Sequence, residues 1–130
     1  MQFNKEIRME KMNVKPATGK LGVLCVGLGA VTSTFMTGVL MARKGLAKPV
    51  GSMTQYDKMR VGRGENKKYL HYGEIVPLAS LNDIVFGAWD VYPANAYESA
   101  VNAEVLQEKD INPVKDELEK NSSDESCFRP

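Results

Sequence analysis

The longest uncharged stretch of the chain, residues 21–42, changes its hydrophobic pattern partway along. Residues 21–26 are almost continuously apolar and run into Gly27 and Gly29, which is typical of a buried strand that ends in a tight turn. After the turn, apolar side chains return at every third or fourth position, as in a helix with one buried face. The pattern therefore predicts a strand, a glycine turn and a helix over about residues 32–44.

Further patterns extend this unit. Residues 58–72 hold two short β-type runs on either side of a glycine-containing turn, which predicts a β-hairpin. Residues 83–89 form a second apolar strand that ends in Asp90, and residues 94–107 carry apolar positions at helical spacing. We expect the two strands to lie side by side in parallel. The fold class is then α/β, an incomplete Rossmann-like unit with the β-hairpin inserted at its edge.

The composition fits a single ordinary domain. The chain has 130 residues, of which 43% are hydrophobic and 25% charged. A length of 130 residues is too short for a dinucleotide domain plus a separate substrate domain. Residues 1–20 form a polar tail without a secretory signal, residues 21–120 the domain, and residues 121–130 an irregular tail. The net charge of +1 argues against strong general affinity for nucleic acid or anionic membranes. The two distant cysteines, Cys25 and Cys127, indicate a reduced, cytoplasmic chain.

The uncharged stretch also permits a membrane interpretation. Its 22 residues are long enough to span a bilayer, and Lys20 and Arg43 flank it. Glycines and hydroxyl side chains interrupt the stretch, however, and the hydroxyls cluster at residues 32–34. A strand, a turn and a helix explain the pattern better, and a single-pass membrane protein anchored by residues 21–42 stays an alternative.

The glycine turn and Asp90 are candidates for nucleotide chemistry. A strand that enters a helix through glycines lets backbone N–H groups approach a pyrophosphate, which also faces the positive end of the helix dipole. The usual third glycine is Thr32 here (G-x-G-x-x-T), so the turn also fits any α/β domain. Asp90, at the carboxyl end of a strand, suits either a ribose-binding carboxylate or a cap that braces the next turn.

Three segments together make the chain similar to the myo-inositol-phosphate synthase (inositol-3-phosphate synthase) family. They are GSMTQ at residues 51–55, NDIVFGAWD at 82–90 and NAYESAVNAEVLQEKD at 95–110, in the family's order and approximate spacing. The resemblance covers about residues 14–120. It implies a tightly held NAD and the conversion of glucose 6-phosphate to myo-inositol phosphate by internal oxidation, aldol-type cyclisation and reduction. It also implies a homo-oligomer, a tetramer when the enzyme is complete.

The resemblance further implies which residues hold NAD. Many family members have G-x-G-G-N-N-G-S-T where this chain has GLGAVTST at residues 27–34, so phosphate contacts fall to backbone N–H groups and hydroxyls. The family's catalytic lysines lie in a later domain, so we expect no catalytic residue here and no activity from this chain alone. The single histidine, His71, has no cysteine or carboxylate spaced around it for a metal site. The expected cofactor-binding residues are Gly27, Leu28, Gly29, Ala30, Val31, Thr32 and Asp90.

Two further hypotheses concern the end of the chain and its function. One choice of codons for residues 120–130 contains a run of A, and removal of one A gives KIRPMKAVFD, similar to the basic, proline-containing stretch expected next in the family. Residues 121–130 are then out of frame, which the encoding DNA tests directly. The other is a functional alternative, in which the chain is a stand-alone nucleotide-binding or regulatory module that uses only half of a Rossmann unit.

Overall fold

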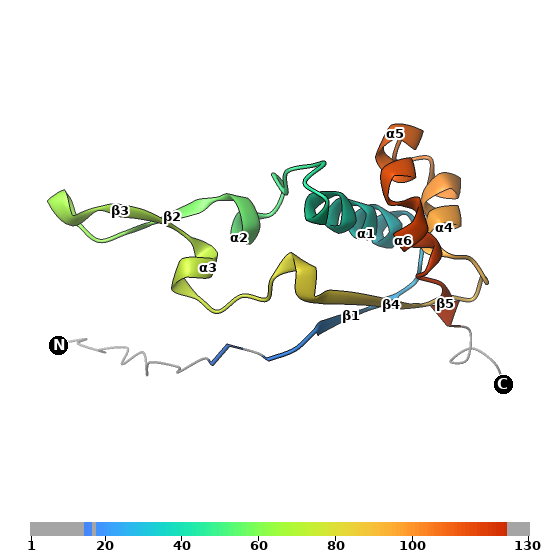
Figure 1. Cartoon of the computed structure of the whole chain (residues 1–130), viewed down its shortest axis with the longest axis horizontal. Coiled ribbons are helices and arrows are strands. Elements are labelled where there is room, and N and C mark those ends of the chain that lie inside the picture. The colour runs from blue at the N-terminus through green and yellow to red at the C-terminus, as the bar shows by residue number, and fades with distance from the viewer. Residues whose placement is uncertain (1–14, 17, 125–130) are drawn as a thin grey trace, which may run out of the picture.

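Two strands that are far apart in the sequence, β1 (Leu21–Val26) and β4 (Ile84–Trp89), pair side by side (Figure 1). The computed structural model describes residues 15, 16 and 18–124. In chain order the helices and strands are β1 (Leu21–Val26), α1 (Ala30–Arg43), α2 (Met53–Tyr56), β2 (Lys58–Val61), β3 (Lys68–His71), α3 (Tyr72–Ile75), β4 (Ile84–Trp89), α4 (Ala96–Ala103), α5 (Glu108–Ile111), α6 (Lys115–Glu119) and β5 (Ser123–Asp124). The 3-10 turns are η1 (Gly64–Asn66), η2 (Leu81–Asp83) and η3 (Asn112–Val114).

The main sheet has the strand order β1-β4-β5, and all of its pairings are parallel. Leu21 lies opposite Ile84 at one end of the β1–β4 pair, and Val26 lies opposite Trp89 at the other. The predicted parallel neighbours are therefore confirmed, and α1 lies on the path between them. Because the strands run the same way, the glycine turn and Asp90 emerge at the same edge of the sheet.

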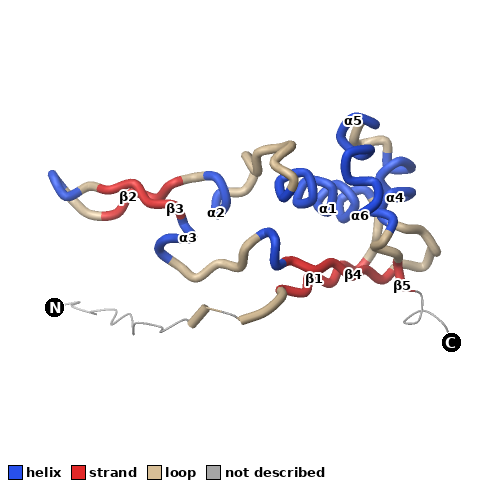
Figure 2. Tube along the Cα trace, in the orientation of Figure 1, coloured by secondary structure: helices blue, strands red, loops and turns tan. Residues whose placement is uncertain are grey.

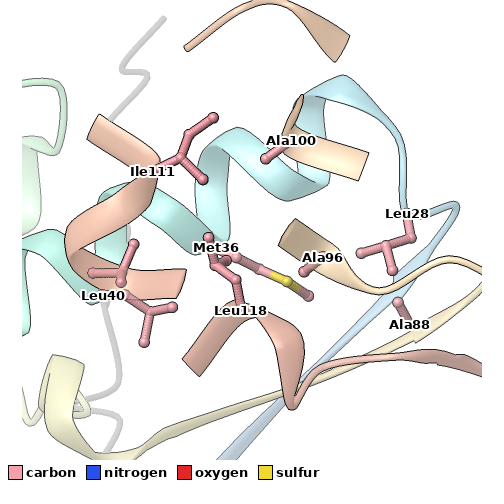
Figure 3. Packing of buried hydrophobic residues seen from close by; sticks show 9 residues of the cluster. Leu28, Met36, Leu40, Ala88, Ala96, Ala100, Ile111 and Leu118 are labelled. Atoms are coloured by element: carbon pink, nitrogen blue, oxygen red, sulfur yellow. The ribbon is translucent and has the colours of Figure 1, made fainter. Parts of the chain in front are cut away.

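The hydrophobic core lies between one face of this sheet and the helices α1, α4 and α6 (Figure 3). Met36 and Leu40 are one turn apart on α1 and are 0% and 5% exposed, because side chains four positions apart share a helix face. Leu118 on α6 reaches the same cluster and is fully buried. The other buried members are Leu28, Ala88, Ala96, Ala100, Ile111 and Val114.

The opposite face of the sheet is open. Leu24, Val26 and Val85 alternate with the core-facing positions of β1 and β4, and they are 65%, 83% and 51% exposed. Parallel sheets normally have both faces covered. The described residues therefore form one covered layer of an architecture that usually has two, as the prediction of an incomplete unit requires.

The uncharged stretch 21–42 is not a single helix. It is divided between β1, the glycine turn and α1, as the strand–turn–helix interpretation predicts. The helix α1 has 14 residues, and in the described part of the chain no helix has the length and apolar character needed to cross a bilayer. The strand–turn–helix interpretation of this stretch is therefore confirmed over a single continuous helix.

Residues 45–80, here called the arm, extend away from the remainder of the described chain, here called the body (Figure 2). The predicted hairpin is confirmed as the antiparallel pair β2–β3, with Lys58 opposite His71. Its position differs from the prediction, because β2 and β3 pair only with each other and do not extend the parallel sheet. The arm contains no buried residue, whereas the core belongs to the body.

The helix predicted over 94–107 is shorter in the structure. Asn95 caps its first turn by accepting the Glu98 N–H at 2.9 Å, and α4 ends where Glu104 takes a left-handed conformation with φ of 53°. A new helix, α5, begins four residues later at Glu108. The half-buried Cys25 lies on β1, as expected for a small core residue, whereas Cys127 lies outside the described residues.

The tail predicted to be irregular has a short regular part. Ser123 and Asp124 form β5 and pair with Ala88 and Trp89 of β4. The Ser123 N–H and hydroxyl both donate to the Ala94 carbonyl, which ties this strand to the start of α4. Residues 125–130, which complete the segment of the frameshift hypothesis, lie outside the described part of the chain.

Candidate functional site

The glycine turn is built by a backbone conformation and a strand-end hydrogen bond. Gly27 has φ of +93°, a conformation that side chains disfavour, and its N–H donates to the Trp89 carbonyl at 2.7 Å. The next residue, Leu28, is 3% exposed because its side chain joins the core cluster. The turn is thus fixed on one side by β4 and on the other by the core.

The turn leads into a helix whose N-terminus carries no capping side chain. Gly29 is the N-cap residue, α1 has no acidic residue in its first turn, and no side chain of the described residues accepts from that turn. The first N–H groups of a helix have no partner within the helix, and together with the dipole they attract anions. A Cβ added at Gly29 would meet no atom within 4 Å, so the backbone is open to an incoming group.

The hydroxyls near this helix start are used within the protein. Thr32 donates through Oγ1 to the Gly27 carbonyl at 2.8 Å, which closes the turn from inside. Ser33 is fully buried, and its hydroxyl is within 3.3 Å of the Ala30 carbonyl. These two side chains support the turn, so the anion donors of the site are backbone N–H groups.

Asp90 connects the two strand ends. Its Oδ2 accepts the Leu28 N–H at 2.6 Å, and its Oδ1 accepts the Tyr92 N–H at 3.1 Å. The Leu28 N–H, followed by the Tyr92 N–H, holds the pKa of the Asp90 carboxyl below its ordinary value, so the carboxylate is charged at neutral pH. The structure therefore contains the brace that the sequence offered as one interpretation of Asp90, in the position where a ribose carboxylate also belongs.

A pocket of about 290 Å³ lies beside these groups. It brings together Leu28, Gly29, Ala30 and Asp90 of the expected residues, whereas Gly27, Val31 and Thr32 do not line it. Val31 is 84% exposed on the outer surface of α1. Gly27 forms the turn through its backbone, and the Thr32 hydroxyl donates to the Gly27 carbonyl. The remaining lining residues are Tyr92, Ala94, Ser99, Asn102 and Ala103.

Sequence reasoning missed the wall that α4 supplies. Ser99 and Asn102 are three positions apart and therefore share one face of α4, next to the pocket. The signal was present, because two polar residues interrupt a helix that directly follows the Asp90 strand. Tyr92 adds a 74% exposed aromatic ring at the pocket, and an exposed ring offers a flat surface to a base.

The other described parts of the chain offer less chemistry for binding an anion. His71 lies in the arm, where its backbone N–H donates to Glu74 at 2.7 Å, and no cluster of metal ligands occurs among the described residues. A larger hollow of about 520 Å³ lies at the opposite end of β4, against Lys20, Asp83 and residues 73–80. It contains no helix N-terminus of comparable length, so the glycine turn is the better anion site.

Comparison with known proteins shows which family the chain is similar to. Residues 21–130 match the model of an NAD-binding family that is described as "Myo-inositol-1-phosphate synthase". Inositol-3-phosphate synthase 1 of Bacteroides thetaiotaomicron is 59% identical over 110 residues, which cover 84% of this chain and 25% of that protein. Inositol-3-phosphate synthase 1 of Oryza sativa subsp. japonica is 36% identical over 99 residues, which cover 67% of this chain and 19% of that protein.

A solved structure of an inositol-3-phosphate synthase is also similar to this chain. The crystal structure of inositol-3-phosphate synthase from Caenorhabditis elegans matches with a TM-score of 0.68 and 26% sequence identity, over 84% of this chain and 24% of that one. The predicted α/β fold with a partial Rossmann-like unit is thereby confirmed. The chain spans a quarter or less of the length of these relatives.

Proposed function

Because the chain belongs to the myo-inositol-1-phosphate synthase family, we propose that it supplies the NAD-binding part of an inositol-3-phosphate synthase. The family predicted from the GSMTQ and NDIVFGAWD segments is confirmed, and NAD is the cofactor of that family's domain. The observation that carries the proposal is the open N-terminus of α1 beside the Asp90 pocket. Uncapped N–H groups, a bare glycine and a carboxylate at one sheet edge are the groups that a dinucleotide needs.

The residues suit the parts of NAD in turn. The diphosphate fits the backbone N–H groups that follow Gly29, since the open space at that glycine allows close approach. The adenosine ribose fits Asp90, whose charged oxygens retain lone pairs beyond the two bonds they already accept. The adenine fits the pocket between Tyr92 and α4. When bound, NAD would accept a hydride from the sugar and later return it.

The activity of the whole enzyme is also a proposal. By family resemblance, the complete enzyme converts glucose 6-phosphate to myo-inositol phosphate through oxidation, aldol-type ring closure and reduction, so that no NAD is consumed. It acts as a homo-oligomer, a tetramer, in the cytoplasm. The resemblance assigns no catalytic lysine to this chain, and we propose that the chain alone forms no product from glucose 6-phosphate and NAD. Product formation by the purified chain would contradict this.

A cofactor titration tests the proposed site. We expect the purified chain to bind NAD in a calorimetric titration, and Gly29→Val to weaken binding because the added side chain fills the approach to the backbone. Gly73→Val is the matched control, because it makes the same change at an open glycine in the arm. Equal NAD affinity of the two variants, with both folded by circular dichroism, would exclude the glycine turn as the diphosphate site.

The ribose assignment has its own test. In a full-length synthase that carries these residues, Asp90→Asn is expected to weaken NAD binding by about 1–3 kcal/mol, the range for a hydrogen bond to a charged group. Lys67→Ala, in the exposed arm, should leave the NAD dissociation constant unchanged. If both variants bind NAD equally well, Asp90 does not contact the cofactor.

The stand-alone module alternative requires the chain to bind NAD without any gain of activity when the rest of a synthase is added.

A further inference from the structure

One side chain holds both loops at the carboxyl edge of the sheet. Asp90 follows β4, yet its Oδ2 accepts the N–H of Leu28, which is 62 positions earlier in the turn after β1. Its Oδ1 accepts the N–H of Tyr92 in its own loop at 3.1 Å. A charged acceptor bonded at 2.6 Å is of the strong class of hydrogen bond. Each carboxylate oxygen therefore fixes a different loop.

The position of Leu28 determines where α1 begins. Its side chain is buried in the core cluster, its N–H is held by Asp90, and the Gly27 N–H before it is held by the Trp89 carbonyl. Gly29, the next residue, is the N-cap, so the first N–H groups of α1 take their direction from this anchored peptide. Gly27 and Gly29 have no side chains of their own, so the turn depends on these contacts and on the Thr32 hydroxyl, which donates to the Gly27 carbonyl at 2.8 Å.

We propose that Asp90 is a positioning residue for the glycine turn, which it holds ready for a diphosphate through the Leu28 N–H. This inference rests on the proposed function, since it concerns how the same turn receives NAD. It adds that the Leu28 N–H is a structural donor, and that the diphosphate is left to the N–H groups of Gly29, Ala30 and Val31. A role limited to ribose binding would leave the turn unaffected by loss of Asp90.

The two roles predict opposite signs for one measurement. Inorganic pyrophosphate has no ribose, so a ribose contact cannot affect it. Removal of a negative charge next to an anion site should by itself strengthen pyrophosphate binding. If Asp90 positions the turn, Asp90→Ala should instead weaken pyrophosphate by about tenfold, the factor expected when the competent loop conformation is populated one tenth of the time.

Hydrogen exchange of the Leu28 amide tests the proposed anchoring directly. In the unliganded chain, NMR hydrogen exchange at this amide should quicken by about tenfold or more in Asp90→Ala, because the hydrogen bond that protects it is gone. Asp90→Asn keeps one acceptor oxygen and should give partial rescue of both exchange protection and pyrophosphate affinity. Asp83→Ala is the matched control, since Asp83 lies at the other end of β4 in an exposed pair with Lys20.

The outcomes separate the two proposals. Quicker Leu28 exchange together with weaker pyrophosphate binding in Asp90→Ala, and neither in Asp83→Ala, supports positioning. Unchanged exchange, or pyrophosphate bound as tightly or more tightly, overturns it, and Asp90→Asn decides the point if Asp90→Ala does not fold. If the wild-type chain binds neither NAD nor pyrophosphate, the proposed function fails for this chain and pyrophosphate binding cannot support positioning. Leu28 exchange in Asp90→Ala then supports or overturns the anchoring by itself.

Discussion

The body and the arm, which lie apart in Figure 1, differ in how they are stabilised. The body encloses a core that includes the fully buried Met36, Val114 and Leu118. The arm holds a two-stranded hairpin of four residues per strand and contains no buried residue. An isolated hairpin of this size is marginally stable in water. Global stability and the candidate site therefore belong to the body, and the arm is a locally ordered extension of it.

The difference in stability between the body and the arm should be largest for a pair of methionine substitutions. Met36→Ala removes a 0% exposed side chain from the core and should lower the free energy of unfolding by about 2–5 kcal/mol. Met59→Ala removes a 36% exposed side chain from β2 and should lower it by less than about 1 kcal/mol. Urea unfolding followed by circular dichroism measures both. Similar losses would show that the arm and the body unfold as one equally packed unit.

Glycine substitutions test whether strain in the arm reaches the body. Gly27 and Gly62 both have positive φ, +93° and +89°, so alanine is strained at either position. Gly27→Ala should lower the free energy of global unfolding by about 1–3 kcal/mol, since the turn is tied to β4 and to the core.

Gly62→Ala carries more local strain, because the added Cβ would clash with the Asn66 carbonyl oxygen. We nevertheless expect the midpoint of global unfolding to stay near wild type, while the amides of β2 and β3 exchange faster by NMR. A fall in the global midpoint as large as that of Gly27→Ala would mean that the arm contributes to the cooperative core.

The sequence predicted the body more completely than the arm, for a physical reason. The run from β1 through α1 has a strand period that changes to a helix period at Gly27, and buried faces impose such periods directly. The hairpin pattern at 58–72 was equally local and correct. Nothing in it states which edge the hairpin pairs with, because an exposed strand has no buried face that would select a neighbour.

Prediction of the candidate site has the same limit. The glycine turn and Asp90 could be identified because each stands at the end of a recognisable strand. The bond between the Leu28 N–H and Asp90 could not, since it joins residues 62 apart through the register of β1 with β4. The end of α4 at Glu104 was missed because a left-handed residue other than glycine leaves little trace in a hydrophobic pattern.

Lowering the pH should reduce the stability of the body through two carboxylates, Asp90 and Glu117, which have different partners. The Leu28 N–H lowers the pKa of Asp90, and the Lys44 ammonium lowers the pKa of Glu117. A lowered folded-state pKa contributes stability that is complete above the unfolded pKa and is lost as the pH falls through the folded value. The midpoint of urea unfolding should therefore fall from about pH 4 downward, and less steeply in Asp90→Asn.

Added salt distinguishes these two contributions. The Lys44–Glu117 pair is partly exposed at 2.7 Å, so high salt should screen it, whereas the Asp90 bond to a backbone N–H should persist. Glu117→Gln should therefore remove most of the salt sensitivity of the acid transition, and Asp90→Asn should keep it. An acid transition that is identical in both variants and in wild type would show that neither carboxylate contributes to stability.

The smallest expected difference is between two lysines. On α6, the Lys115 ammonium lies 4.7 Å from the centre of the Tyr97 ring and 3.6 Å from Glu119 one turn along the helix. Such exposed contacts are worth about 0.3–1 kcal/mol each at most, because water and salt screen them. Lys67 lies in the exposed arm just before β3. Lys115→Ala should therefore lower the free energy of unfolding by no more than about 1 kcal/mol, and Lys67→Ala by less than about 0.5 kcal/mol. Replicate urea titrations of both variants can resolve this gap. A larger loss of unfolding free energy in Lys67→Ala than in Lys115→Ala would contradict this comparison. An exposed lysine of the arm would then stabilise the fold more than a lysine packed on an aromatic ring of the body.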